Sequence, residues 1–481
     1  MERGTLSAMV DLPKLKFASP KEKGVMVWLA EPQIFAAAMA APEKAADLPS
    51  EALAFAATTR FEAKAGRLLW FVGADGAPGA VYFVDTGAAA DPFQPAALAG
   101  LLPSGVYRFA TPPGKADLAS LAFLLGSHRF ARYKSEREAP RLIAPPGVGV
   151  KEIESIANSV AFARDLIDTP ANDLGPDELE AAIQAVADRF GAKISVIRGE
   201  KLARDFPLIH AVGKGSPRAP RLVDLRWKPK RARQLTLVGK GVCFDSGGLD
   251  IKPESAMGLM KKDMGGAAAA IAAAAMIMAA DVDVALRLIV PIVENSVSGE
   301  AFRPGDVYSS RKGLSVEIGN TDAEGRLILA DALALASEEK PELLVDFATL
   351  TGAARVALGP DLPPFFTDDE ALAADIARHG AAVNDPVWRL PLWQAYDSKL
   401  DGKVGQITNA PAGGMAGAIT AALFLRRFVD RSAESKTSWV HFDIYGWTPA
   451  AKPGRPEGGE AQVARLIFSL AQERFGAANL R

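Results

Sequence analysis

The chain has 481 residues, of which 49% are apolar and 23% are charged, and its formal net charge is −2. These values are typical of a soluble globular protein with about two to four domains. The near-zero charge gives no general attraction to nucleic acid or to anionic membranes, so we expect no nucleic-acid partner. The single cysteine, Cys243, excludes a disulfide framework and argues against a cysteine-based zinc site.

Two segments bear on where the protein works. Residues 1–17 carry scattered charges and no apolar run of the signal-peptide type, so we expect a cytoplasmic protein. Residues 264–280 are apolar throughout but short, and they are mostly Ala and Gly. A membrane helix usually needs about 20 residues of stronger apolar character, so we expect a buried, close-packed helix and no membrane partner.

In the first 150 residues, short apolar strands mix with helices. We predict strands at residues 25–29, 68–71 and 80–84 and helices at residues 95–101 and 117–125. The Pro- and Gly-rich run at 140–149 then predicts a domain boundary. We therefore expect a first domain over residues 1–150 and a linker helix over 151–172.

From residue 173 to 481 we expect a second, larger domain. Its helices are predicted at residues 179–190, 266–280, 326–337, 368–379 and 418–428, and the linker helix at 152–166. Its strands are predicted at residues 194–197, 222–225, 235–238, 285–293, 315–318 and 343–347. Alternating strands and helices predict an α/β domain whose sheet is largely parallel and covered on both faces.

Four carboxylates follow predicted strand ends or open a helix: Asp245, Asp263, Asp322 and Glu324. In open α/β sheets the carboxyl ends of the strands form the binding crevice, so these side chains are placed to converge. Gathered without partners they would repel one another, and two divalent cations would cancel their charge. Zn²⁺, Mn²⁺ and Mg²⁺ all suit such ligands. The alternative is that each is a solvated charge or a helix cap, as Asp263 could be.

Other catalytic motifs are absent from the sequence. There is no Walker pattern, the four His residues are scattered, and no His-Glu-x-x-His occurs. Ser246 lies in Asp-Ser-Gly-Gly rather than in a Gly-x-Ser-x-Gly elbow, which gives little support to a serine hydrolase.

The octapeptide at residues 320–327, Asn-Thr-Asp-Ala-Glu-Gly-Arg-Leu, resembles the signature of the leucine aminopeptidase family, the cytosol aminopeptidases. Further motifs resemble the same family in the same order, at residues 238–241, 244–248, 251–253, 262–266, 303–306 and 348–353. The resemblance covers about residues 164–447. It implies a smaller N-terminal α/β domain, with an oligomeric or regulatory role, and a larger C-terminal catalytic α/β domain with a mainly parallel central sheet. It also implies a homohexamer.

By position, the resemblance assigns the functional residues. It implies two divalent metal ions, Zn²⁺ or Mn²⁺, held by Lys240, Asp245, Asp263, Asp322 and Glu324. It implies Lys252 and Arg326 as catalytic residues, and Met260, Asn320, Thr349 and Gly352 as the substrate pocket. It also implies a bicarbonate ion, held by Arg326, as the general base. Lys240 could act as a ligand only as a neutral amine. Free lysine has a pKa near 10.4, so two adjacent cations would have to lower the pKa of Lys240.

The expected function is a metalloaminopeptidase that releases N-terminal amino acids from peptides with a free N-terminus. A metal-bridging water would attack the scissile carbonyl, and Lys252 would stabilise the oxyanion. The sequence departs from the family at Tyr445, where a small residue is common, so the pocket is expected to be reshaped. Two alternatives stay open: a non-catalytic DNA-binding or scaffold role, and another kind of two-metal hydrolase.

Overall fold

The chain forms two compact units. A computed structural model describes residues 13–41, 47–85, 87, 90–228, 233–430, 432 and 435–476. The smaller unit consists of Pro13–Ala161 and Ala450–Glu457, and the larger unit is built mainly from Phe162–Pro449. The division runs through helix α6 (Val150–Asp168), so a single long helix belongs to both units. The division at residues 150 and 172 stays a prediction.

The smaller unit has a mixed sheet in the order β2-β3-β1-β4-β5. Its strands are β1 (Val25–Ala30), β2 (Leu68–Val72), β3 (Pro78–Phe83), β4 (Val106–Phe109) and β5 (Arg141–Leu142). Its helices are α2 (Pro32–Ala40), α3 (Ser50–Thr59), η2 (Gln94–Ala97), α4 (Leu98–Leu101) and α5 (Ala116–Ser127). Alternate residues of β3 enter two apolar cores: Val81 and Phe83 pack into one, and Ala80 and Tyr82 into the other. This alternation is the pattern of a strand buried on both faces.

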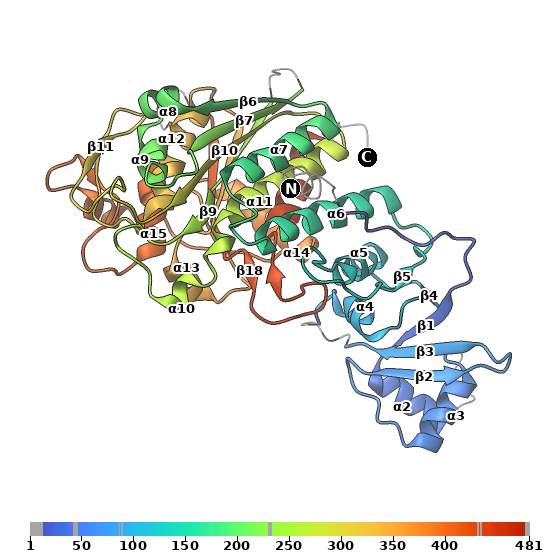
Figure 1. Ribbon diagram of the computed structural model, residues 1–481. Helices are drawn as coiled ribbons and strands as arrows, with labels where there is room; N and C mark the ends of the chain where they lie inside the picture. The colour runs from blue at the N-terminus through green and yellow to red at the C-terminus, as the bar shows by residue number, and fades with distance from the viewer. Residues whose placement is uncertain are drawn as a thin grey trace. The chain divides into compact units, whose positions relative to one another are not determined.

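The larger unit is built around a sheet in the order β15-β14-β17-β13-β8-β10-β7-β6, with β9 paired to β10 (Figure 1). Its strands are β6 (Lys193–Arg198), β7 (Arg221–Trp227), β8 (Gln234–Gly239), β9 (Gly241–Asp245), β10 (Ala285–Asn295), β13 (Leu343–Ala348), β14 (Pro364–Phe366), β15 (Trp388–Arg389) and β17 (Ser438–Asp443). The central strands β10, β8, β13 and β17 run parallel to their neighbours in this series. Antiparallel pairings flank them: β10 with β7 and β7 with β6 on one side, and β17 with β14 on the other.

Helices cover both faces of this sheet. The helices of this unit are α7 (Pro176–Phe190), α8 (Gly199–Asp205), α9 (Pro207–Gly213), α10 (Glu254–Met257), η3 (Met260–Met264), α11 (Gly265–Ala279), α12 (Glu324–Ser337), α13 (Gly352–Leu358), α14 (Glu370–Ala382), η4 (Gln394–Leu400), α15 (Gly417–Arg426) and α16 (Ala464–Phe475). Helices α7, α11, α14 and α16 pack on one face, and α9, α12 and α15 on the other (Figure 1). The expected α/β class, with helices on both faces of a parallel-rich sheet, is confirmed.

The Ala-rich helix α11 lies very close to the sheet. A Cβ on Gly266 would lie 2.2 Å from the Phe347 carbonyl oxygen, and a Cβ on Gly239 would lie 2.6 Å from the Ala267 Cα. Glycine at both positions is therefore required by the approach of the two backbones. This close approach fixes the loop after β8 against the start of α11, where Lys240 and Asp263 lie.

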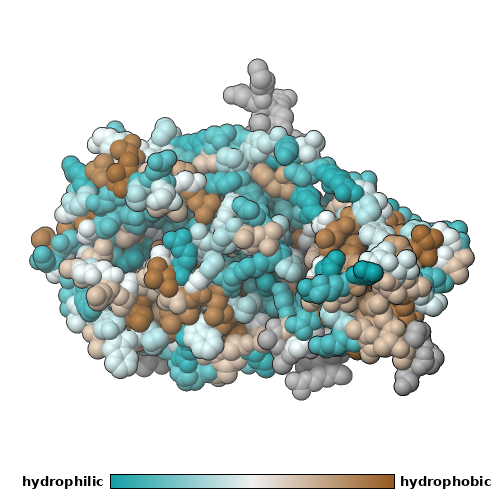
Figure 2. All heavy atoms as spheres, turned by 90° about the horizontal axis from the view of Figure 1, so that it is seen from below, coloured by the Kyte–Doolittle hydropathy of each residue, from teal (hydrophilic) through white to brown (hydrophobic). Residues whose placement is uncertain are grey.

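The stretch Met260–Ala279 is long and apolar enough to cross a membrane by composition alone, but 94% of its apolar window is buried inside the structure. That burial is what the sequence predicts for a core helix. On the face drawn in Figure 2, hydrophilic and hydrophobic residues are interspersed.

Several local features differ from expectation. The helix predicted at 95–101 is a 3-10 turn, η2, followed by the short α4. The strand predicted at 315–318 is β12 (Ser315–Glu317), which lies outside the main sheet, between β11 (Val307–Ser309) and β16 (Ile407–Thr408). Strand β17 was not predicted, and a separate hairpin-like pair is formed by β18 (Trp447–Thr448) and β19 (Gly458–Gly459).

Candidate metal centre

The predicted site residues lie on segments that leave the sheet at the carboxyl ends of its strands. Lys240 follows β8, Asp245 ends β9, and Thr349 follows β13. Asp263 lies in η3, just before α11, and Glu324 opens α12. This is the end of an open α/β sheet at which binding sites form.

Lys240 lies between two of the predicted ligands. Its Nζ is 2.8 Å from Asp263 Oδ2 and 2.9 Å from Glu324 Oε1, and it donates a hydrogen bond of 2.8 Å to the Thr349 carbonyl oxygen. Burial alone would lower the pKa of Lys240, but the charges of Asp263, Glu324 and Asp245 raise it above the ordinary lysine value. In the absence of other cations, Lys240 is therefore an ammonium group.

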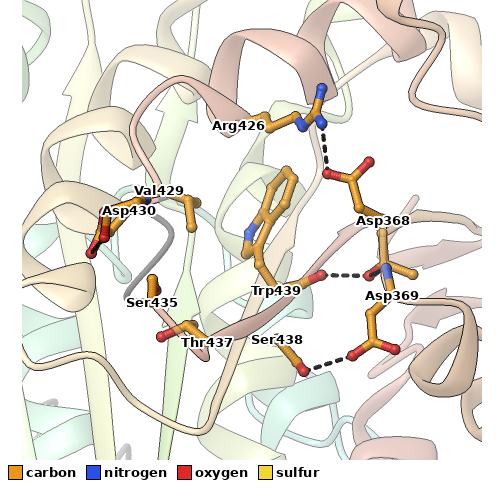
Figure 3. A pocket seen from close by; sticks show the side chains of 11 residues that line it. Asp368, Asp369, Arg426, Val429, Asp430, Ser435, Thr437, Ser438 and Trp439 are labelled. Atoms are coloured by element: carbon orange, nitrogen blue, oxygen red, sulfur yellow. Dashed lines mark hydrogen bonds and ion pairs between the residues drawn. The ribbon is translucent and has the colours of Figure 1, made fainter.

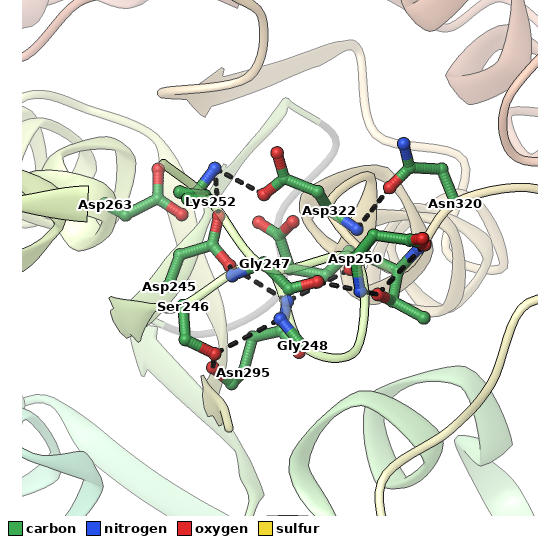
Figure 4. A network of polar contacts seen from close by, with 12 residues as sticks. Asp245, Ser246, Gly247, Gly248, Asp250, Lys252, Asp263, Asn295, Asn320 and Asp322 are labelled. Atoms are coloured by element: carbon green, nitrogen blue, oxygen red, sulfur yellow. Dashed lines mark hydrogen bonds and ion pairs between the residues drawn. The ribbon is translucent and has the colours of Figure 1, made fainter. Parts of the chain in front are cut away.

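Lys252 bridges the other two carboxylates. Its Nζ is 2.9 Å from Asp245 Oδ2 and forms a second, close ion pair with Asp322 Oδ1 (Figure 4). Burial opposes its charge, but Asp245 and Glu324 raise the pKa of Lys252. The four carboxylates are thus held together by two ammonium groups, each between two of them.

Even so, the carboxylates are not fully compensated. Burial, followed by the charge of Asp245, raises the pKa of Glu324 to about 8 and that of Asp322 to about 6. Asp245, Asp322 and Glu324 each offer an oxygen within 4.8 Å of the others. The arrangement accordingly has an excess of negative charge that additional cations would relieve.

Asp245 is held in place by Asn295, which the sequence analysis missed. The Asn295 Nδ2 donates to Asp245 Oδ1 at 2.9 Å and to the Thr321 carbonyl oxygen at 3.0 Å (Figure 4). The Gly247 N–H donates to the same Asp245 oxygen at 2.9 Å. No motif surrounds Asn295, which ends β10, and only the pairing of β10 with β9 brings it here.

Asn409 is a second residue that the sequence analysis missed. Its Oδ1 accepts from the Gly319 N–H at 2.8 Å, and its Nδ2 donates to the Asn320 carbonyl oxygen at 2.8 Å. Its own carbonyl oxygen accepts from Arg326 Nη1 at 2.6 Å. Asn409 is fully buried and therefore fixes both the loop that carries Asp322 and the guanidinium of Arg326.

Arg326 faces a cavity of about 260 Å³, whose lining includes Asn320, Asp322, Leu350 and Gly352. Burial lowers the pKa of Arg326 to about 10, so the guanidinium is still charged at neutral pH. In the described part of the chain, Arg326 Nε has no hydrogen-bond partner. The cavity thus presents a buried cation with unused donor capacity.

Of the four residues expected in a substrate pocket, two line the Arg326 cavity and two do not. Asn320 and Gly352 line the Arg326 cavity. The Asn320 Oδ1 also accepts from the Asp322 N–H at 2.6 Å. Thr349 Oγ1 donates to Asp263 Oδ1 at 2.8 Å, and Met260 is half-buried at the start of η3.

A second pocket, of about 270 Å³, lies at the start of β17, at the end of that strand away from Asp443 (Figure 3). Arg426 forms an ion pair with Asp368 there at 2.8 Å, and Ser438 donates to Asp369 at 2.7 Å. None of the predicted site residues lines this pocket.

Comparison with known proteins agrees with this geometry. Residues 161–468 match the model of the cytosol aminopeptidase family, catalytic domain. A probable cytosol aminopeptidase of Syntrophotalea carbinolica is 38% identical over 370 residues, which are 73% of each chain. A cytosol aminopeptidase of Encephalitozoon cuniculi is 41% identical over 330 residues, which are 67% of each chain.

Solved structures are similar over nearly the whole chain. The crystal structure of the cytosol aminopeptidase from Coxiella burnetii has a TM-score of 0.89 and 38% identity, and the match covers 96% of this chain and 100% of that one. The bottromycin maturation enzyme BotP in complex with Mn has a TM-score of 0.83 and 30% identity, with 94% and 99% covered. The chain therefore belongs to the cytosol aminopeptidase family, and it is a metal-dependent aminopeptidase.

Proposed function

We propose that Lys240, Asp245, Asp263, Asp322 and Glu324 hold two divalent metal ions, Zn²⁺ or Mn²⁺, and that peptides lose their N-terminal residue at this centre. The observation that carries the proposal is the gathering of four carboxylates whose negative charge two lysines do not fully offset. BotP, a similar structure, is described in complex with Mn.

The donor set fits such ions. Asp263 Oδ2 and Asp322 Oδ1 are buried, and each is paired with an ammonium group, that of Lys240 and that of Lys252 respectively. Carboxylate oxygens and one amine suit Zn²⁺ and Mn²⁺ alike. When bound, two ions would neutralise the carboxylates, acidify a water shared between them and polarise the substrate carbonyl. Lys240 would serve as a ligand only after releasing its proton.

Lys252 supplies the electrostatic part of the chemistry. Its ammonium group stays protonated because its pKa is raised, and it is only partly buried. As negative charge develops on the oxygen of the scissile amide, this group can donate a hydrogen bond to it. A fixed donor aimed at developing charge is among the strongest contributions that a side chain makes to catalysis.

Arg326 is proposed to hold a bicarbonate ion, which would take the proton from the attacking water. The buried guanidinium, with Nη1 on Asn409 and Nε unused, leaves donors free for a planar anion in the adjoining cavity. Met260, Asn320, Thr349 and Gly352 are proposed to surround the substrate, as positional matching to the family implies.

The wider setting is also proposed by analogy. Relatives are named cytosol aminopeptidases, which supports a cytoplasmic location, and the family resemblance supports a homohexamer. Residues 1–150 are proposed to serve oligomerisation or regulation. The intact set of carboxylates and lysines supports the enzyme over a DNA-binding or scaffold role or another kind of two-metal hydrolase.

The test is hydrolysis of aminoacyl-arylamides by protein that has been stripped of metal and then reloaded with Zn²⁺ or Mn²⁺. We expect metal-dependent release of the first residue, no release from N-acetylated substrates, and a loss of at least about 100-fold in kcat/KM for Lys252→Ala and Glu324→Ala. Glu300→Ala, which removes an exposed carboxylate, is the matched control and should retain activity. Folded protein that binds two ions but releases nothing would contradict the proposal.

A further inference from the structure

Three side chains that the chemistry above does not use, Lys262, Arg355 and Tyr445, form a cationic cluster. The Lys262 Nζ lies 4.7 Å from the centre of the Tyr445 ring, and the Arg355 Cζ lies 5.0 Å from the same centre. Arg355 Nη1 also donates to the Tyr445 hydroxyl at 3.0 Å. One aromatic ring therefore holds two positive charges beside each other, which would otherwise repel.

The cluster adjoins the proposed substrate pocket on the Asp263 side. Lys262 lies between Met260 and Asp263 in η3. Gly446, the residue after Tyr445, lies against Thr349, since a Cβ on Gly446 would be 3.1 Å from Thr349 Cγ2. The Tyr445 backbone is fixed there, because its N–H donates to Gln462 Oε1 at 2.9 Å.

Arg355 approaches from a second element. It lies in α13, one turn after Gly352, where the helix begins. Its side chain is exposed, whereas Lys262 retains only 5% of its accessible surface. The cluster therefore extends from the buried floor beside Asp263 to the solvent-exposed rim of the site.

The carboxylates near this cluster, Asp263 and Asp443, favour the charged form of Lys262, but burial outweighs them and lowers the pKa of Lys262. In the part of the chain that the structure describes, neither Lys262 nor Arg355 forms an ion pair with an acidic side chain. Asp443 is occupied: it accepts from the Leu350 N–H at 3.0 Å, from the Thr351 N–H at 3.1 Å and from the Thr351 hydroxyl at 2.6 Å. A buried ammonium group without a carboxylate partner costs free energy that an anionic ligand would recover.

We propose that Lys262 and Arg355 bind the side-chain carboxylate of an N-terminal Glu or Asp residue, and that Tyr445 positions both cations for this contact. The inference rests on the proposed aminopeptidase function and names its substrate class. An arginine fork can bind a carboxylate in bidentate fashion, and the buried lysine adds a point charge. A site built to bind a charged group rejects the neutral analogue, because its own polar groups are then left unpaired.

The decisive comparison is between isosteric substrates. Arylamides of Glu and Gln, of Asp and Asn, and of Leu would be hydrolysed by metal-loaded protein of the full chain. We expect kcat/KM for Glu or Asp to exceed that for its own amide by about tenfold or more. If Leu and Gln are released as fast as or faster than Glu and Asp, this inference is wrong and the proposed function stands. If no substrate is released, the proposed function itself is wrong.

Two substitutions test whether Lys262 and Arg355 cause the preference for an acidic N-terminal residue. Arg355→Gln, at an exposed position, should reduce the Glu/Gln ratio of kcat/KM to within about threefold of unity, and Lys262→Met should do the same. Arg378→Gln, an exposed arginine in α14 that pairs with Glu473 and Asp375, is the matched control and should keep the wild-type ratio. A ratio unchanged in Arg355→Gln and Lys262→Met would overturn the assignment.

Inhibition by free amino acids gives a readout that does not depend on turnover of acidic substrates. Free glutamate should inhibit release of Leu competitively with a Ki about tenfold lower than that of glutamine, and the difference should shrink at high salt. Equal inhibition by the two amino acids, in wild-type protein at low salt, would contradict the proposal.

Discussion

At the scale of single residues, Gly325 shows how tightly the centre is built. A Cβ at this position would lie 2.6 Å from the Lys240 Cε and 2.7 Å from its Nζ. Lys240 cannot move aside freely, because Asp263, Glu324 and the Thr349 carbonyl hold its Nζ. Position 325 therefore requires glycine, because the Lys240 side chain packs directly against helix α12 there.

We expect Gly325→Ala to displace Lys240 and to lower metal affinity by about 10- to 100-fold, the loss typical when the support of a metal ligand is disturbed. The fold should persist, because alanine is the better helix former. Metal content after dialysis, together with thermal unfolding, checks this. Gly100→Ala, a helical glycine with open space at its Cβ, is the control. Unchanged metal retention in Gly325→Ala would contradict the steric argument.

The motifs in the sequence located the carboxylates and lysines that meet at the centre, because each lies in a short conspicuous segment. They did not locate Asn295 or Asn409. Each is an isolated amide that acts through hydrogen bonds to residues 50 and 89 positions away in sequence: Asn295 to Asp245, and Asn409 to Asn320. Such contacts arise from the tertiary fold, and no local sequence pattern predicts them.

At the scale of elements, Asp331 joins three segments of the larger unit. It lies in α12, and its Oδ2 accepts from the Leu208 N–H at 2.9 Å, at the start of α9. Its Oδ1 accepts from the Arg311 N–H at 2.8 Å. Burial outweighs these donors and raises the pKa of Asp331 to about 7. Helix α12, which carries Glu324, is thereby hydrogen-bonded to the start of α9 and to the turn between β11 and β12 that contains Arg311.

This shift predicts how stability varies with pH. The folded state binds the Asp331 proton more tightly than the unfolded state does, so the contribution is fully present below pH 4 and is lost as pH rises to about 7. The free energy of unfolding of the wild type relative to Asp331→Asn should therefore fall between pH 4.5 and pH 8, by up to about 4 kcal/mol. Denaturant unfolding at both pH values measures it, and Glu300→Gln should show no such change. A difference that increases with pH would mean that the backbone donors dominate.

The predicted elements were mostly found because their apolar runs are long or strictly periodic, as in β10 and α11. Strand β17 was missed because only three of its six residues, Trp439, Val440 and Phe442, are apolar, and His441 interrupts them. His441 is fully buried against Asp346, 2.5 Å from its carboxylate. The sequence pattern alone cannot distinguish a polar side chain that is buried and paired inside a sheet from a polar side chain on the surface.

At the scale of the whole molecule, the class and the alternation of strands and helices were predictable, but the strand order was not. The order β17-β13-β8-β10 places strands from residues 234–443 side by side in a sequence that depends on long-range pairing. The same order explains why the site is composite: its residues come from loops after β8, β9, β12 and β13. The centre therefore links segments that follow strands of two different sheets, because β12 belongs to the sheet β11-β12-β16.

This arrangement predicts where metal ions act on the structure. Because ligand binding stabilises only the state that binds, removal of the ions should loosen the segments that carry the ligands. Hydrogen exchange measured by mass spectrometry, with and without Zn²⁺, should show at least tenfold faster exchange on metal removal in peptides covering residues 260–266 and 318–327. Peptides from β1 and β3, in the smaller unit with its own cores, should not change.

Glu324→Ala provides the control, because a variant that fails to hold the ions should exchange equally fast with and without Zn²⁺. Uniform slowing across both units in the wild type would indicate that the ions act on global unfolding rather than on the local loops. A response confined to the ligand-bearing segments, and absent from Glu324→Ala, would tie the metal ions to the carboxylate cluster without reference to turnover.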